Sequence, residues 1–152
     1  MSQLGRRILF FSLGILGIAI VVGFVINVSA SSSVGDASLT IEVTGVANTK
    51  GKIFAAVCDK TTFLKQCEQT RMEPAAAIVA LNFSHLKSGS YAVMVFHDEN
   101  NNQKFDKTSG GIPLEGYGFS RNAKGRYGPP MFEDAMIDVE SGNNIISIKL
   151  VY

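Results

Sequence analysis

The stretch "LTIEVTG" (residues 39–45) alternates strictly between apolar and polar side chains. Leu39, Ile41 and Val43 fall on one face of an extended chain, and the polar residues between them fall on the other. This period of two is typical of a half-buried β-strand, because successive side chains of a strand point to opposite faces of its sheet. The stretch therefore predicts a strand that covers a hydrophobic core with one face.

Other segments also have strand character. "GKIFAAVCD" (residues 51–59) is apolar on both faces, as a central strand of a sandwich would be. Residues 60–74 break the pattern and predict a loop or a single helical turn. "AAAIVALNFSHL" (residues 75–86) fits a helix or a strand, and we predict a strand at 78–83 because "GSYAVMVFHD" (residues 89–98) follows after a short turn. These two strands are expected to pair as a β-hairpin.

The C-terminal part returns to alternation. "MFEDAMIDVES" (residues 131–141) places alternate apolar residues on one face, "GNN" (residues 142–144) predicts a turn, and "IISIKLVY" (residues 145–152) predicts a closing strand. Six or seven strands separated by turn signals indicate an all-β fold. We predict an antiparallel β-sandwich over residues 39–152.

The N-terminus predicts export. Two arginines precede an uncharged apolar run at residues 8–28, and "VSA" then places small residues before a cleavage site after Ala30. Residues 1–30 are thus predicted to be a signal peptide, and 31–38 a short polar linker. The apolar run is also long enough to span a bilayer, so an uncleaved anchor is the alternative. Both alternatives place the rest of the chain outside the cytoplasm.

Cys58 and Cys67 both lie in the part predicted to be exported. An even cysteine number in an oxidising compartment favours a disulfide between them, with two buried free thiols as the alternative. Without the two arginines near the N-terminus the chain has 12 basic and 13 acidic residues, and its net charge is near −1. No basic patch is evident, so nucleic acid is not an expected partner.

An acidic, asparagine-rich loop, "HDENNNQKFD" (residues 97–106), follows one of the predicted strands. Its spacing predicts a weak structural calcium site, and the ligands would be the side chains of Asp98, Asn100, Asn102 and Asp106 with the main-chain carbonyl of Lys104. Glu99 or Glu115 would complete the shell. The loop departs from an EF-hand loop because Gln103 and Ser109 replace its glycine and its bidentate glutamate. Alternatively, these side chains only cap the backbone of a turn.

Three segments carry a family resemblance: "VFHDENNNQKFD", "GIPLEGYGFS" and "RNAKGRYGPPMFEDA". They resemble the bacterial secreted proteins grouped as domain of unknown function 2141. The resemblance implies export and a small β-sandwich of prealbumin-like or immunoglobulin-like kind, and it supplies no established reaction. The family loop usually reads Asp-x-Asn-Gly-Asn-Gly-x-x-Asp, whereas Asn101 and Gln103 occupy the glycine positions here.

Residues 99–130 are rich in glycine and proline and contain several aromatic residues. Tyr117, Phe119 and Tyr127 fit two interpretations: a platform for a sugar or peptide ligand, or plugs that hold a long loop against the sandwich. The sequence favours plugs.

Two function classes remain. The first is a non-enzymatic module of the periplasm or the cell surface, anchored to the inner membrane if the N-terminal segment stays uncleaved, which binds a protein or polysaccharide of the envelope. The second is a small periplasmic hydrolase that uses His97, Asp98, Glu115 and Ser120. A nucleophile elbow would need glycine where Asn122 stands, so the sequence favours the binding module.

Overall fold

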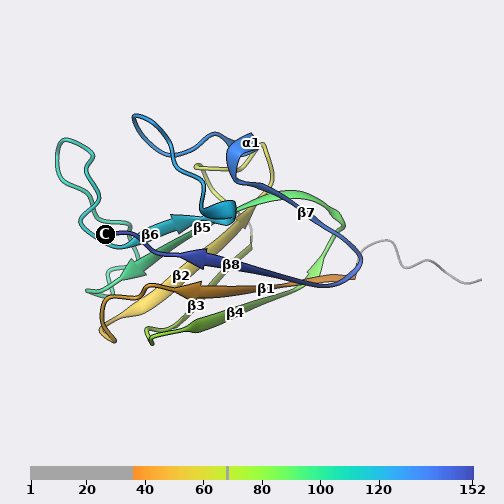
Figure 1. Cartoon of the computed structure of the whole chain (residues 1–152), viewed down its shortest axis with the longest axis horizontal. Coiled ribbons are helices and arrows are strands. Elements are labelled where there is room, and N and C mark those ends of the chain that lie inside the picture. The colour runs from red at the N-terminus through yellow and green to blue at the C-terminus, as the bar shows by residue number, and fades with distance from the viewer. Residues whose placement is uncertain (1–35, 68) are drawn as a thin grey trace, which may run out of the picture. The chain divides into compact units, whose positions relative to one another are not determined.

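The computed structural model describes residues 36–67 and 69–152 (Figure 1). The predicted signal or anchor segment, residues 1–30, lies outside them, as does most of the predicted linker. The described strands are β1 (Ala37–Thr44), β2 (Lys52–Cys58), β3 (Gln69–Pro74), β4 (Val79–Leu86), β5 (Gly89–Asp98), β6 (Tyr117–Phe119), β7 (Met136–Val139) and β8 (Gly142–Lys149). A 3₁₀ turn, η1 (Ser120–Asn122), and a single helical turn, α1 (Phe132–Ala135), complete the elements. Across these two described ranges, no helix is long and apolar enough to cross a membrane.

The strands form two sheets (Figure 1). Sheet A has the order β4-β1-β8, and sheet B has the order β3-β2-β5-β6, with β7 also paired to β5. All named pairs are antiparallel except β1 and β8, which run parallel with Val43 opposite Ile148. The predicted all-β sandwich is confirmed, with one parallel pair among its antiparallel ones.

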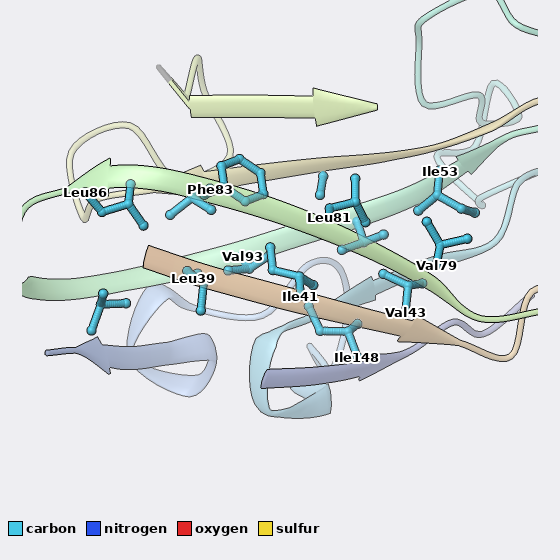
Figure 2. Packing of buried hydrophobic residues seen from close by; sticks show 14 of the residues in the cluster. Leu39, Ile41, Val43, Ile53, Val79, Leu81, Phe83, Leu86, Val93 and Ile148 are labelled. Carbon is cyan, nitrogen blue, oxygen red and sulfur yellow. The ribbon is translucent and has the colours of Figure 1, made fainter. Parts of the chain in front are cut away.

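The core lies between the sheets. Leu39, Ile41 and Val43 are fully buried, as their alternation in β1 predicts. Figure 2 shows them beside the buried side chains of β4 and of sheet B, including Leu81 and Val93. Burial of such aliphatic side chains stabilises the fold by about 1.5–3 kcal/mol each, before the loss of conformational entropy is counted.

The predicted hairpin between residues 78–83 and 89–98 is wrong. Strand β4 pairs with β1, with Leu81 opposite Ile41, whereas β5 pairs with β2 in the other sheet. The short connection between them therefore crosses from sheet A to sheet B. The physical reason is burial: β4 is buried on one face, as an outer strand is, and most of β5 is buried on both faces.

Three further boundaries differ from prediction. The predicted loop at 60–74 contains β3, a mostly exposed edge strand with no apolar alternation to signal it. The predicted turn at 142–144 is instead the start of β8, where Gly142, with φ of 94°, pairs with Ala37 of β1. The end of the predicted linker, Ala37 and Ser38, already belongs to β1.

A second apolar cluster covers the outer face of sheet B, the face directed away from sheet A. It consists of Ala56, Cys58, Phe63, Ala92, Phe119, Phe132 and Ala135. Phe63 reaches it from the loop 59–67, and its ring packs on Phe119 at 6.1 Å and on Phe132 at 5.8 Å. The outer face of sheet B is therefore a second packing surface, in contrast to the polar outer face of sheet A, where Thr40 bonds Asn82 at 2.9 Å.

The predicted disulfide is confirmed. Cys58 ends β2, and its bond to Cys67 closes the loop 59–67, with the two Cα atoms 4.9 Å apart. At the start of the loop, hydrogen bonds from Thr61 and Thr62 lower the pKa of Asp59 to about 2. Lys60 pairs with Glu133 of α1 at 2.7 Å, and this contact lowers the pKa of Glu133. The bond and the ion pair hold Phe63 over sheet B.

Candidate functional site

The buried carboxylate of Asp98 anchors the backbone of the acidic loop. Its side chain is only 1% exposed. One carboxylate oxygen accepts the N–H of Asn102 at 3.0 Å, and the other accepts the N–H of Gln103 at 2.8 Å. A buried carboxylate is stable when its oxygens accept several hydrogen bonds. Asp98 thus folds the loop back onto the end of β5.

The structure brings three other predicted calcium ligands together. The side-chain amides of Asn100 and Asn102 both donate to Oδ2 of Asp106, at 2.7 and 2.8 Å. The N–H of Lys104 donates to the side-chain oxygen of Asn102 at 2.8 Å. The predicted ligands are therefore neighbours, joined by hydrogen bonds within the loop itself.

Within residues 36–67 and 69–152 no three His, Cys, Asp or Glu side chains gather as a metal site. The predicted site does not need such a group. It contains only two carboxylates, those of Asp98 and Asp106, and depends on amide and main-chain oxygens for the rest.

Glu115 joins the two ends of the acidic loop. Its side chain is buried, and its two oxygens accept the N–H of Glu99 at 3.2 Å and the N–H of Asp106 at 3.0 Å. The sequence predicts Glu115 as a residue that completes the calcium shell or as one of the four hydrolase residues. In the structure Glu115 braces the loop backbone.

The positions where the family resemblance has glycine adopt the left-handed backbone. Asn101 has φ of 59° and Gln103 has φ of 62°. Asparagine tolerates this conformation better than glutamine does. The departure from the family pattern therefore places strain at Gln103.

This strain gives a first prediction. Gln103→Gly should raise the free energy of unfolding by about 0.5–1 kcal/mol, since glycine adopts positive φ without a steric cost. Lys104→Gly is the matched control, because Lys104 is adjacent and has no positive φ, so this change should lower stability slightly. Urea unfolding of both variants measures the difference, and equal effects would refute the claim of strain.

His97 is fully buried in a network that includes the C-terminal residue. Its Nε2 lies 2.6 Å from the carbonyl of Lys50, and its Nδ1 lies 2.7 Å from the hydroxyl of Tyr152. A carbonyl only accepts, so Nε2–H of His97 donates to the carbonyl of Lys50. The hydroxyl of Tyr152 in turn accepts the N–H of Ala47 at 3.0 Å.

Burial raises the pKa of Tyr152, and the nearby charge of Glu99 raises it further. The phenol thus stays protonated over the physiological pH range, with its oxygen 2.7 Å from Nδ1 of His97. Gly116 makes the geometry possible, because a Cβ there would lie 2.3 Å from the ring of Tyr152. The side chain of His97 therefore links β5 to the carbonyl of Lys50 and to Tyr152.

Ser120 is also fully buried. Its hydroxyl accepts the N–H of Val93 at 2.9 Å and donates to the carbonyl of Ala135. It joins η1 to β5 and to the end of α1. A hydroxyl held in this way is a structural bridge and is not presented to a substrate.

The predicted hydrolase residues do not converge. His97, Asp98, Glu115 and Ser120 are all buried, and each has its own hydrogen-bond partners. No hydrogen bond or ion pair joins any two of these four residues. None of the four lines either of the two cavities described next.

Aromatic rings form a continuous row on the outer face of sheet B. The row, in order, is Phe54, Phe96, Phe105, Tyr117 and Phe119. Successive ring centroids are 4.8, 5.5, 5.6 and 6.2 Å apart. These separations are those of favourable aromatic pairs. Strand register explains the row, because Phe54 faces Phe96 across β2 and β5, and Phe96 faces Tyr117 across β5 and β6.

Two cavities flank Tyr117 and Phe119. One, of 360 Å³, lies between the disulfide loop, the segment 105–113 and Pro129, and its floor includes Met94 and Phe96. The other, of 440 Å³, lies between β6, the segment 122–130 and the end of β8. Both cavities include Tyr117, Phe119 and Gly128 in their walls, so we treat them as one groove. Figure 1 shows the teal loop after β5 and the blue loop before α1 rising on the same side of β5 and β6.

Tyr117, Phe119 and Tyr127 were each expected to be either part of a ligand platform or a plug that holds the loop. The structure gives different answers for the three residues. Phe119 is a plug, being 7% exposed. Tyr127 is 94% exposed at the tip of its loop, so the plug interpretation is wrong there. The loop that carries Tyr127 is tight, because a Cβ on Gly125 would lie 2.0 Å from the Gly128 oxygen. Tyr117 is half-buried and lines both cavities.

Comparison with known proteins gives one match. A family model described as "Uncharacterized protein conserved in bacteria (DUF2141)" matches residues 41–147. The chain belongs to this family. The match begins in β1 and ends in β8, so the acidic loop, the disulfide and most of the groove lie within the DUF2141 domain. A search of curated proteins and a search of solved structures found no match.

Proposed function

We propose that this DUF2141 protein is an exported, non-enzymatic module of the bacterial envelope that binds its partner, a polysaccharide, in the groove on sheet B. The observation that carries the proposal is the aromatic row. Phe105 and Tyr117, two half-buried rings of the row, line a cavity pair between three loops that are far apart in sequence. Ligand sites are typically concave, largely apolar and about 300–1,000 Å³ in volume.

The residues around the groove support binding over catalysis. The titratable side chains in its walls are those of Tyr117 and of lysines, with no histidine, cysteine or carboxylate among them. The four residues of the hydrolase hypothesis are occupied in the hydrogen bonds that hold the loops and β5. Exposed apolar side chains add surface that a ligand would cover: Leu64 lines one cavity, and Tyr127 precedes Gly128, which lines both.

The acidic loop is proposed to contribute to the groove by binding calcium. We propose that Asp98, Asn100, Asn102, Asp106 and the carbonyl of Lys104 hold a weakly bound calcium ion. Phe105, one ring of the aromatic row, lies between the last two of these residues. An ion bound by the loop would therefore stiffen one wall of the groove.

Calcium should raise the stability of metal-stripped protein. At about ten times its Kd the ion adds roughly 1.4 kcal/mol to the free energy of unfolding, which corresponds to a few degrees in Tm. Asp106→Asn should abolish this increment, because it removes a charged ligand and keeps a similar shape. Asp98→Asn is a poorer test, since Asp98 also anchors the loop backbone. An unchanged melting curve in millimolar calcium would reduce the loop to a hydrogen-bonded turn.

The groove is tested by co-sedimentation with insoluble envelope polysaccharide. Protein recovered from the envelope fraction, beginning at Ser31 if cleaved or at Met1 if anchored, should sediment with the polysaccharide. Phe105→Ala should weaken this binding about tenfold, as expected for an aromatic side chain at the centre of a site. Ile145→Ala is the control, because Ile145 is an exposed apolar residue on the other sheet. Equal binding by both variants, or release of shortened sugar chains, would contradict the proposal.

A further inference from the structure

The walls of the groove carry positive charge only. Lys65 and Lys107 line the cavity next to the disulfide loop, and Lys124 and Lys149 line the cavity next to β8. No aspartate or glutamate lines either cavity. The four lysines come from four different segments of the chain, so only the fold brings them together.

These lysines are not used to hold the fold by ion pairs. Among residues 36–67 and 69–152, the lysine ion pair is that of Lys60 with Glu133, outside the groove. Lys107 lies over the ring of Phe105, with its Nζ 4.9 Å from the ring centroid, and Lys65 donates to the carbonyl of Thr61 at 3.2 Å. Ammonium groups grouped without carboxylates repel one another, and an anionic ligand would relieve that repulsion.

The charge is local to the groove. Residues 31–152 contain 12 basic and 13 acidic residues, so the exported part has no general excess of positive charge. A groove of one sign on a near-neutral molecule selects ligands by charge.

We infer that the groove binds an acidic polysaccharide, a chain of uronic-acid residues. This inference rests on the proposed function and names its ligand class. The C–H faces of the sugar rings would cover Tyr117 and Phe105, since both are apolar flat surfaces. The carboxylates would meet the lysines at the walls of both cavities, so that successive sugars use the two cavities in turn.

The sheet geometry argues against an acidic peptide. An extended peptide usually binds by adding a strand to an open sheet edge. The floor of this groove is the face of β5 and β6, and β5 is already paired with β2 on one side and with β6 and β7 on the other. A single-stranded nucleic acid would need a broader basic surface than four lysines on a near-neutral protein provide.

Calorimetric titration of the full chain tests the charge of the ligand. The probes are a short oligogalacturonate and the same oligomer with its carboxylates methyl-esterified. The acid form should bind at least about tenfold more tightly than the ester, and its affinity should fall as salt is raised from roughly 50 to 500 mM. Lys107→Gln and Lys124→Gln should each weaken binding about threefold, the scale of a partly exposed ion pair. Lys87→Gln, at an exposed turn away from the groove, should have no effect.

The outcomes separate this inference from the proposed function. If the ester binds as tightly as the acid and Phe105→Ala weakens both, the groove is a sugar site and the inferred charge selectivity is wrong. Polyglutamate or oligothymidylate of matched charge binding as tightly as the uronate would overturn the saccharide class. If neither sugar binds and Phe105→Ala also leaves envelope co-sedimentation unchanged, the proposed function itself fails.

Discussion

His97→Ala should lower the free energy of unfolding by about 3–5 kcal/mol, because it removes a large, fully buried side chain and leaves a cavity. The change also leaves the carbonyl of Lys50 and the hydroxyl of Tyr152 without their partner. Buried polar groups that lose a hydrogen bond cost about 1–3 kcal/mol. This is the largest effect that we expect of any single substitution discussed for this chain.

His85→Ala is the matched control for this substitution. His85 is exposed and meets Asp36 at 2.9 Å on the surface, so its loss should change stability by less than about 0.5 kcal/mol. Chemical denaturation of both variants gives the comparison. If His97→Ala lowers the free energy of unfolding by less than about 1 kcal/mol, the structural role of His97 is contradicted. A catalytic role would then be supported again.

Removing the disulfide should have the second-largest effect. The double variant Cys58→Ala with Cys67→Ala is expected to lose roughly 2–3 kcal/mol, from the chain entropy of a ten-residue loop. Ligand binding should fall as well, because the loop 59–67 carries Leu64 and Lys65 into the groove wall.

Reductant provides the internal control. Dithiothreitol should lower the Tm of the wild-type chain to near that of the double variant, and it should leave the double variant unchanged. A wild-type Tm that is insensitive to reductant would show that the bond does not stabilise the exported protein. Loss of stability with unchanged ligand binding would show that the loop is not part of the groove.

Local patterns predicted those parts of the fold that depend on neighbouring residues. The alternation in residues 39–45 predicts β1, because burial on one face imposes a period of two. Cys58 and Cys67 are close in sequence and flank a loop, so their pairing is also a local feature. The acidic loop folds back on itself, so four of its predicted ligand residues are indeed neighbours in space.

Features that depend on distant pairing could not be predicted in this way. The period of a strand shows that it has a buried face and does not show which sheet contains it, so the hairpin at 78–98 was expected and is wrong. Strand β3 is an exposed edge, and β6 has three residues, so neither has a usable apolar pattern.

The groove and the role of His97 are non-local for the same reason. The groove walls come from segments near residues 64, 107, 128 and 149, which no sequence spacing connects. The hydrogen bond from Tyr152 to His97 joins residues 55 positions apart. A histidine next to an aspartate in sequence resembles a catalytic pair, whereas in the structure the two side chains face opposite sides of β5.

Hydroxyl-radical footprinting of the protein on envelope polysaccharide tests the central claim most directly, because it reports on individual side chains. We predict that bound polysaccharide protects Phe105, Tyr117 and Tyr127 from oxidation. Ile145, on the outer face of sheet A, should oxidise as in the free protein. Protection of Ile145 with continued oxidation of Tyr117 and Tyr127 would place the binding face on sheet A and contradict the proposal.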